Sequence, residues 1–155
     1  MSVILGQITP HRIVLCADRR IVATVNDEDG RKREFVHTDN ESKLFSHGNL
    51  GIIYAGSSTI NGFPISKIIS DFLFFRREID KPETLAQILW KHLRSMNEGK
   101  STIIITAGMS ESRFCIVMCD TASGEFQLHY SCELVFAGET GLLERFINGI
   151  TLRIG

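Results

Sequence analysis

The first twenty residues constrain the fold most, because two apolar runs of strand length flank one short turn. The runs cover residues 2–6 and 13–20, and the turn covers residues 9–12. This arrangement is typical of a β-hairpin. The two outer ends of a paired hairpin lie side by side, so we expect Ser2 near Asp18 and Arg20. A hydroxyl close to the start of the chain beside fixed charges is a candidate catalytic centre.

The size and charge of the chain indicate one ordinary globular domain. At 155 residues, the simplest organisation is a single domain over residues 1–155. A net charge of −1 gives no basic surface for nucleic acid or for an anionic membrane. No apolar run approaches the ~20 residues of a membrane-spanning helix. The first residues do not resemble a secretory signal, so we expect a cytoplasmic protein.

The cysteines and histidines do not predict a metal site or a cofactor. Cys16, Cys115 and Cys119 lie in apolar, strand-like runs, which favours buried free thiols over disulfides. The spacing from Cys115 to Cys119 differs from the zinc-knuckle spacing, and the histidines are scattered. We therefore expect neither a metal nor a cofactor.

The order of the expected elements indicates an α+β fold. Strands are expected at 21–25 and 33–38, around an Asp29-Gly30 turn, and at 42–45 and 50–55. Apolar residues at helical spacing predict one helix over 65–73 and another from 80 to 96. Strands are then expected at 102–107, 113–119, 125–130 and 134–137, and a third helix around 142–147. Helices between two blocks of antiparallel strands suggest two packed sheets with helices outside them.

Four short motifs, in order, resemble the proteasome β-subunits and their bacterial relatives, which are N-terminal-nucleophile hydrolases. The hydroxyl residue and glycine of residues 2–6 have the family's spacing, and residues 17–20 match its Ala-Asp-x-Arg signature. Residues 43–45 match its lysine followed by two apolar residues, and residues 55–56 match its Ala-Gly. The resemblance covers nearly the whole chain, and it implies a four-layer αββα sandwich of two antiparallel sheets.

The resemblance also implies a catalytic role for particular residues. Removal of Met1 would give Ser2 a free α-amine with a pKa of about 7.7–8.0, suited to act as the base that a serine hydroxyl needs. Lys43 would keep this amine unprotonated by like-charge repulsion, and Asp18 would hold Lys43 charged and oriented. The backbone N–H of Gly56 would stabilise the oxyanion.

The same resemblance implies how substrate and partners would be bound. Arg20, Val22 and Tyr54 fall where the family contacts its substrate, and Tyr54 would narrow the first specificity pocket toward small side chains. The implied substrate is a peptide or an unfolded protein. The implied assembly is a homo-oligomer with its sites facing an inner chamber, and an ATP-driven unfoldase is left open as a partner.

An alternative interpretation is a catalytically inactive, proteasome-like structural or assembly subunit. Residues 138–141 read Gly-Glu-Thr-Gly where the family has Gly-Ser-Gly, and a carboxylate from Glu139 would stabilise the charged ammonium form of the amine. The chain also stops where the family continues into further elements. Taken singly, Asp18 could form a rim salt bridge with Arg20, and Lys43 could be a solvated strand-edge lysine.

Overall fold

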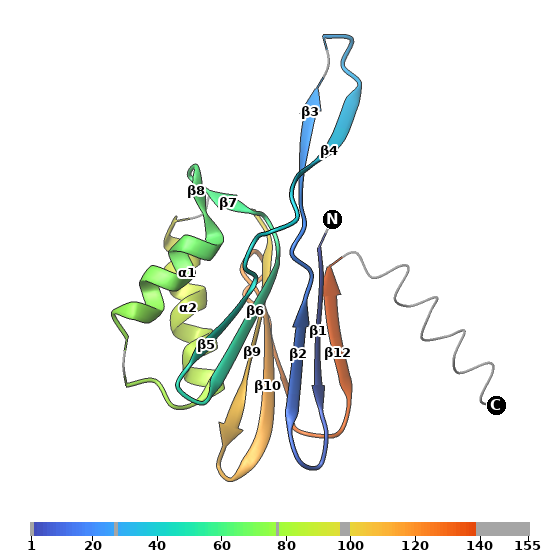
Figure 1. Cartoon of the computed structure of the whole chain (residues 1–155). Helices are drawn as coiled ribbons and strands as arrows, with labels where there is room; N and C mark the ends of the chain where they lie inside the picture. Colours follow the sequence, from blue (N-terminus) through green and yellow to red (C-terminus); the bar gives the residue numbers. More distant parts are fainter. Residues whose placement is uncertain (1, 27, 77, 97–99, 139–155) are drawn as a thin grey trace, which may run out of the picture.

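The computed structural model describes residues 2–26, 28–76, 78–96 and 100–138 (Figure 1). The strands are β1 (Val3–Ile8), β2 (Ile13–Ala17), β3 (Ile21–Asn26), β4 (Lys32–Thr38), β5 (Leu44–His47), β6 (Leu50–Gly56), β7 (Thr59–Ile60), β8 (Phe63–Pro64), β9 (Thr102–Ser110), β10 (Arg113–Asp120), β11 (Phe126–His129) and β12 (Leu134–Gly138). The helices are α1 (Ile65–Phe74) and α2 (Pro82–Met96).

The predicted N-terminal hairpin is confirmed, and it forms part of a small sheet with the order β12-β1-β2. The central strand, β1, pairs antiparallel with both neighbours, and Ile4 lies opposite Ala17 on one side and Ala137 on the other. Because side chains alternate along a strand, Ile4 and Ile8 share one face and are buried. This register brings the start of β1 beside the end of β2.

The larger sheet has the order β11-β10-β9-β6-β5, with all neighbours antiparallel. One of its faces packs against the small sheet, where Ile53, Ile105 and Ile116 share an apolar core with β1 and β12. The opposite face carries Ile52 and Ile104, which pack in a second core with buried residues of α1 and α2. Successive apolar residues of β6 and β9 therefore point alternately into the two cores, one on each face of the larger sheet.

The predicted four-layer αββα sandwich is wrong. The described residues are mainly β, and their layers are the helices, the five-stranded sheet and the three-stranded sheet (Figure 1). Both helices use their apolar stripes on one face of the larger sheet, so the part of the chain that the structure describes supplies no helix for the far face of the small sheet. The predicted third helix, around 142–147, lies outside the described residues.

The strands β3 and β4 form a separate two-stranded hairpin that projects beyond the two main sheets (Figure 1). Val25 lies opposite Arg33, and the register shifts between Ile21 and Val22. The predicted turn at Asp29-Gly30 joins the strands, with Gly30 at a φ of +74°. Neither helix among the described residues is long and apolar enough to cross a lipid bilayer.

Candidate active site

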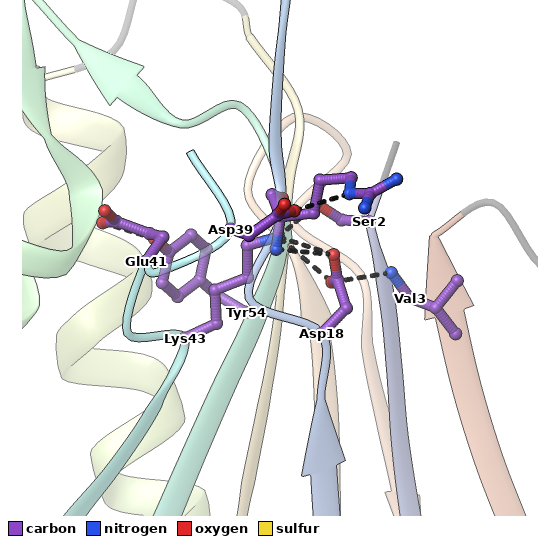
Figure 2. Close-up of polar contacts among 8 residues, drawn as sticks. Ser2, Val3, Asp18, Asp39, Glu41, Lys43 and Tyr54 are labelled. Atoms are coloured by element: carbon purple, nitrogen blue, oxygen red, sulfur yellow. Dashed lines mark hydrogen bonds and ion pairs between the residues drawn. The ribbon is translucent and has the colours of Figure 1, made fainter. Parts of the chain in front are cut away.

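A buried lysine lies at the centre of the candidate site. The side chain of Lys43, which precedes β5, is only 3% exposed. Its Nζ donates to Ser2 Oγ at 2.8 Å and to the carbonyl oxygen of Arg20 at 2.6 Å (Figure 2). It also lies 3.0 and 3.1 Å from the two carboxylate oxygens of Asp18. The lysine is therefore not the solvated strand-edge residue of the simpler interpretation.

These contacts define the chemical state of the lysine. An ammonium group has three N–H donors and no acceptor, and here acceptors from Ser2, Asp18 and Arg20 surround it. An ammonium group whose three N–H groups all donate hydrogen bonds has no lone pair to accept the proton of the Ser2 hydroxyl. Any base that activates Ser2 must therefore be another group, while Lys43 supplies positive charge directly at the hydroxyl oxygen.

Asp18 is fixed by the pairing of β1 and β2, which it directly follows. Its Oδ1 accepts the backbone N–H of Val3 at 3.0 Å, and its Oδ2 accepts the N–H of Arg20 at 3.2 Å (Figure 2). The backbone N–H of Asp18 in turn donates to the carbonyl oxygen of Val3 at 3.1 Å. The carboxylate is thus positioned by two backbone donors before it pairs with Lys43. These bonds hold the carboxylate in place beside the buried lysine, which needs a hydrogen-bonded partner.

Arg20 contributes through its backbone, while its side chain points to another partner. The guanidinium Nε lies 2.7 Å from Asp39 Oδ1, and both of these side chains are more than half exposed. The rim salt bridge between Asp18 and Arg20 considered from the sequence is therefore not formed, because Asp18 pairs with Lys43. An exposed pair such as Arg20–Asp39 contributes at most about 1 kcal/mol.

The two other predicted substrate-binding residues lie on different elements. Val22 is half-buried in β3, opposite Val36. Tyr54 is 1% exposed in β6, donates its hydroxyl to Glu41 Oε1 at 3.4 Å and stacks on Phe45. Desolvation by burial, followed by the charge of Glu41, raises the pKa of the Tyr54 phenol well above its usual value. Tyr54 therefore fills space as a neutral side chain in the core beneath the helices.

Gly56 ends β6 at a point where two strands approach closely. Its φ is +111°, and an added Cβ would lie 2.7 Å from the carbonyl oxygen of Ser101 and 3.2 Å from Thr102 Cα. Both the conformation and the space require glycine here. Packing alone therefore accounts for this glycine, and its role as an oxyanion donor stays a prediction.

Sequence reasoning missed the contribution of Gly138. This residue ends β12 with a φ of +99°, and an added Cβ would lie 1.9 Å from the carbonyl oxygen of Ser2. Only glycine lets β12 run this close to the residue that carries the candidate nucleophile. The sequence feature that could have indicated this close approach is a glycine directly after an apolar strand. The neighbouring Glu139 and Thr140 lie outside the described residues.

The prediction of buried free thiols is confirmed for two of the three cysteines concerned. Cys115 and Cys119 are buried free thiols, whereas Cys16 is exposed because it lies on the outer side of the edge strand β2. Within residues 2–138, leaving out the gaps, no group of three or more His, Cys, Asp or Glu side chains is placed to hold a metal ion.

Comparison with known proteins assigns no family to this arrangement. No protein-family model matches the sequence, and no curated protein matches it significantly. The resemblance to N-terminal-nucleophile hydrolases therefore rests on the four motifs and on the contacts among Ser2, Asp18 and Lys43.

Proposed function

We propose that the chain is an N-terminal-nucleophile peptidase that hydrolyses amide bonds with Ser2 after removal of Met1. The observation that carries this proposal is the 2.8 Å contact between Lys43 Nζ and Ser2 Oγ, made while the same ammonium is held by Asp18 and Arg20. A buried positive charge on a serine hydroxyl favours the alkoxide character that develops during attack.

The proposed reaction uses the α-amine of Ser2 as the base, because Lys43 has no free acceptor. The amine takes the hydroxyl proton as Oγ attacks the substrate carbonyl, and a negative charge forms on the carbonyl oxygen. The N–H of Gly56 is the proposed donor to that oxygen. The protonated amine then gives its proton to the leaving amine, which departs and leaves an ester on Ser2. A water molecule then gives a proton to the same amine and attacks the ester carbonyl. The acyl product leaves as an acid, and the amine returns the proton to Ser2 Oγ.

The proposal extends to substrate, assembly and location. Peptides or unfolded polypeptides are the proposed substrates, with Arg20 and Val22 contributing to their binding, whereas the buried Tyr54 has no surface to offer a substrate. A cytoplasmic homo-oligomer is the proposed form, with an ATP-driven unfoldase as a candidate partner.

The test combines intact-mass measurement with covalent labelling. We expect purified protein to lack the mass of Met1 and to take up one molecule of an inhibitor directed at N-terminal hydroxyl groups, mapped to Ser2. Ser2→Ala should abolish the adduct. Ser57→Ala is the matched control, since the Ser57 hydroxyl bonds the Thr59 carbonyl rather than Lys43. Retained Met1 together with no adduct on Ser2 would reject the proposal.

A catalytically inactive structural or assembly subunit is the second candidate, and the same contacts favour it in one respect. Lys43 joins the start of β1, the end of β2 and the start of β5, which is a stabilising role that needs no chemistry. This candidate predicts an unlabelled Ser2 and an unchanged assembly state in Ser2→Ala.

A further inference from the structure

The two main sheets part at one end and leave a cavity of about 320 Å³ between them. The cavity lies where β2 begins and close to the turn between β9 and β10. Figure 1 shows that this turn and the turn between β1 and β2 lie at the end of the molecule away from the N-terminus. Lys43 lies at the opposite end of β2, against Asp18, so the cavity is separate from the candidate active site.

The walls of this cavity are apolar. Ile13 and Leu15 of β2 and Phe114 of β10 line it, and all three are half-buried at the edge of the core between the sheets. In the larger sheet Gly51 lies opposite Ala107, so this wall has two adjacent positions with almost no side chain. An apolar group in the cavity would therefore extend the core into space that these residues leave open.

The mouth of the cavity is polar and positively charged. The polar lining residues are His11, Arg12 and Asn49, and all three are exposed, whereas none of the lining residues is acidic. Between residues that the structure describes, the guanidinium of Arg12 forms no ion pair. The backbone of Arg12 is fixed by the turn, because its N–H donates to Thr9 Oγ1 at 3.1 Å and its carbonyl oxygen accepts the N–H of Thr9 at 2.9 Å. The lining set therefore complements a negative charge at the mouth and an apolar group inside.

We propose that this cavity binds a small aliphatic carboxylate, with its chain between the two sheets and its carboxylate group at Arg12. A guanidinium group pairs with a carboxylate through two parallel N–H groups, and the side chains of His11 and Asn49 add further donors. Apolar walls with a few polar groups gathered at one point are typical of a small-molecule site of this volume. The inference does not depend on any catalytic role of Ser2.

A free carboxylate fits this cavity better than the end of a polypeptide does. Each residue of a polypeptide brings a backbone N–H and a C=O that must be hydrogen-bonded when they are buried. The side chains of Ile13, Leu15 and Phe114 offer no partner for such groups, whereas an aliphatic chain needs none.

Titration calorimetry of the wild-type protein with straight-chain ligands tests both parts of the proposal. Each buried methylene should tighten binding about fourfold, so octanoate should bind about 16-fold more tightly than hexanoate. Octan-1-ol has a chain of the same length without the charge, and it should bind more weakly than octanoate. No binding of octanoate, or an affinity equal to that of hexanoate or octan-1-ol, would overturn the proposal. Tighter binding of the peptide acetyl-Ala-Ala-Leu than of octanoate would also overturn it, in favour of a polypeptide C-terminus.

Two pairs of variants locate the bound octanoate. Arg12→Gln should weaken its binding about fivefold, as expected for a charge pair at an exposed site. Arg31→Gln, at an exposed arginine in the turn before β4, is the matched control and should leave binding unchanged. Met109→Asp places a carboxylate in the lining, at a side chain 45% exposed, and should abolish binding. Leu128→Asp is its matched control, because Leu128 is 46% exposed on β11 and does not line the cavity. Equal effects of the two members of either pair would overturn the proposal.

Discussion

Lys43 and Asp18 form the only ion pair between described residues in which one partner is almost fully buried. The charge of Lys43 is enclosed at 3% exposure, whereas Asp18 keeps 30%. Burial of a charge is tolerated only when it is paired and hydrogen-bonded. The two partners are therefore not equivalent, and their removal should have different consequences.

Asp18→Asn should destabilise the protein more than Lys43→Met does. The first change leaves a buried ammonium without its counter-charge, and we expect a loss of ~2–3 kcal/mol, below the 3–5 of a fully buried pair because Asp18 is partly solvated. The second leaves a carboxylate that water and two backbone N–H groups still stabilise. Urea unfolding of both variants measures the difference. A larger loss for Lys43→Met would contradict this account of the pair.

Part of the site could be predicted from the sequence. The hairpin pattern brings Ser2 to Asp18 because the register of two short strands is a local property, and the motif at Lys43 identifies the third member by resemblance. The carbonyl of Arg20 and the N–H of Val3 could not be predicted, because backbone groups carry no side-chain signature. Hydrogen bonds of this kind become visible only when three separate segments are placed together.

A glycine at the end of β12 determines how closely this strand can approach β1. Gly138 combines a positive φ with a steric limit, whereas Gly30 combines a positive φ of +74° with open space around it. Substitution at Gly30 therefore measures the free-energy cost of the positive φ alone. Substitution at Gly138 measures that cost together with the cost of a steric clash.

Gly138→Ala should unfold the protein far more readily than Gly30→Ala does. At Gly30 we expect a cost of about 1–2 kcal/mol for the left-handed conformation alone. At Gly138 the new Cβ would overlap the carbonyl oxygen of Ser2, so β12 must shift and the loss should exceed ~3 kcal/mol. Thermal unfolding followed by circular dichroism measures both values. Similar losses would show that β12 is free to move away from Ser2.

The helices and the hairpins were predictable, but their arrangement in layers was not. The stripes of α1 and α2 follow from residue spacing, and the Asp29-Gly30 turn follows from local turn chemistry. The face of a sheet that an apolar helix covers depends on contacts between distant segments. Both helices pack against the same face of the larger sheet. The sequence pattern was therefore compatible with a fourth layer that the described residues do not form.

Burial separates the four cysteines of the molecule into two classes. Burial raises the pKa of the Cys115 thiol to about 11 and that of Cys119 to about 12, with the charges of Glu83 and Asp120 adding to the effect. Cys16 and Cys132 are exposed. We expect two thiols to react quickly with a maleimide at pH 7.5 and two to react only after unfolding, which mass spectrometry can count.

The same shifts predict a loss of stability in alkali. In the unfolded chain these thiols titrate near about 8.5, so below that pH both states are protonated and their contribution to stability is complete. As the pH rises from about 8.5 toward the folded values near 11 and 12, only the unfolded state loses protons, and stability falls. Urea midpoints at pH 8 and 9.5 measure the decline. In the double variant Cys115→Ala, Cys119→Ala the decline should be smaller, and an equal decline would contradict the assignment.

The proposed reaction requires a free amine on Ser2, and one comparison of two preparations tests this requirement. Two preparations are needed: a chain that begins at Ser2, released from a cleavable N-terminal fusion, and the same chain with Met1 retained. We predict hydrolysis of unfolded polypeptide by the first preparation and none by the second, with Ser2→Ala as inactive as the second. Equal rates from both preparations, or no hydrolysis by either, would contradict the account.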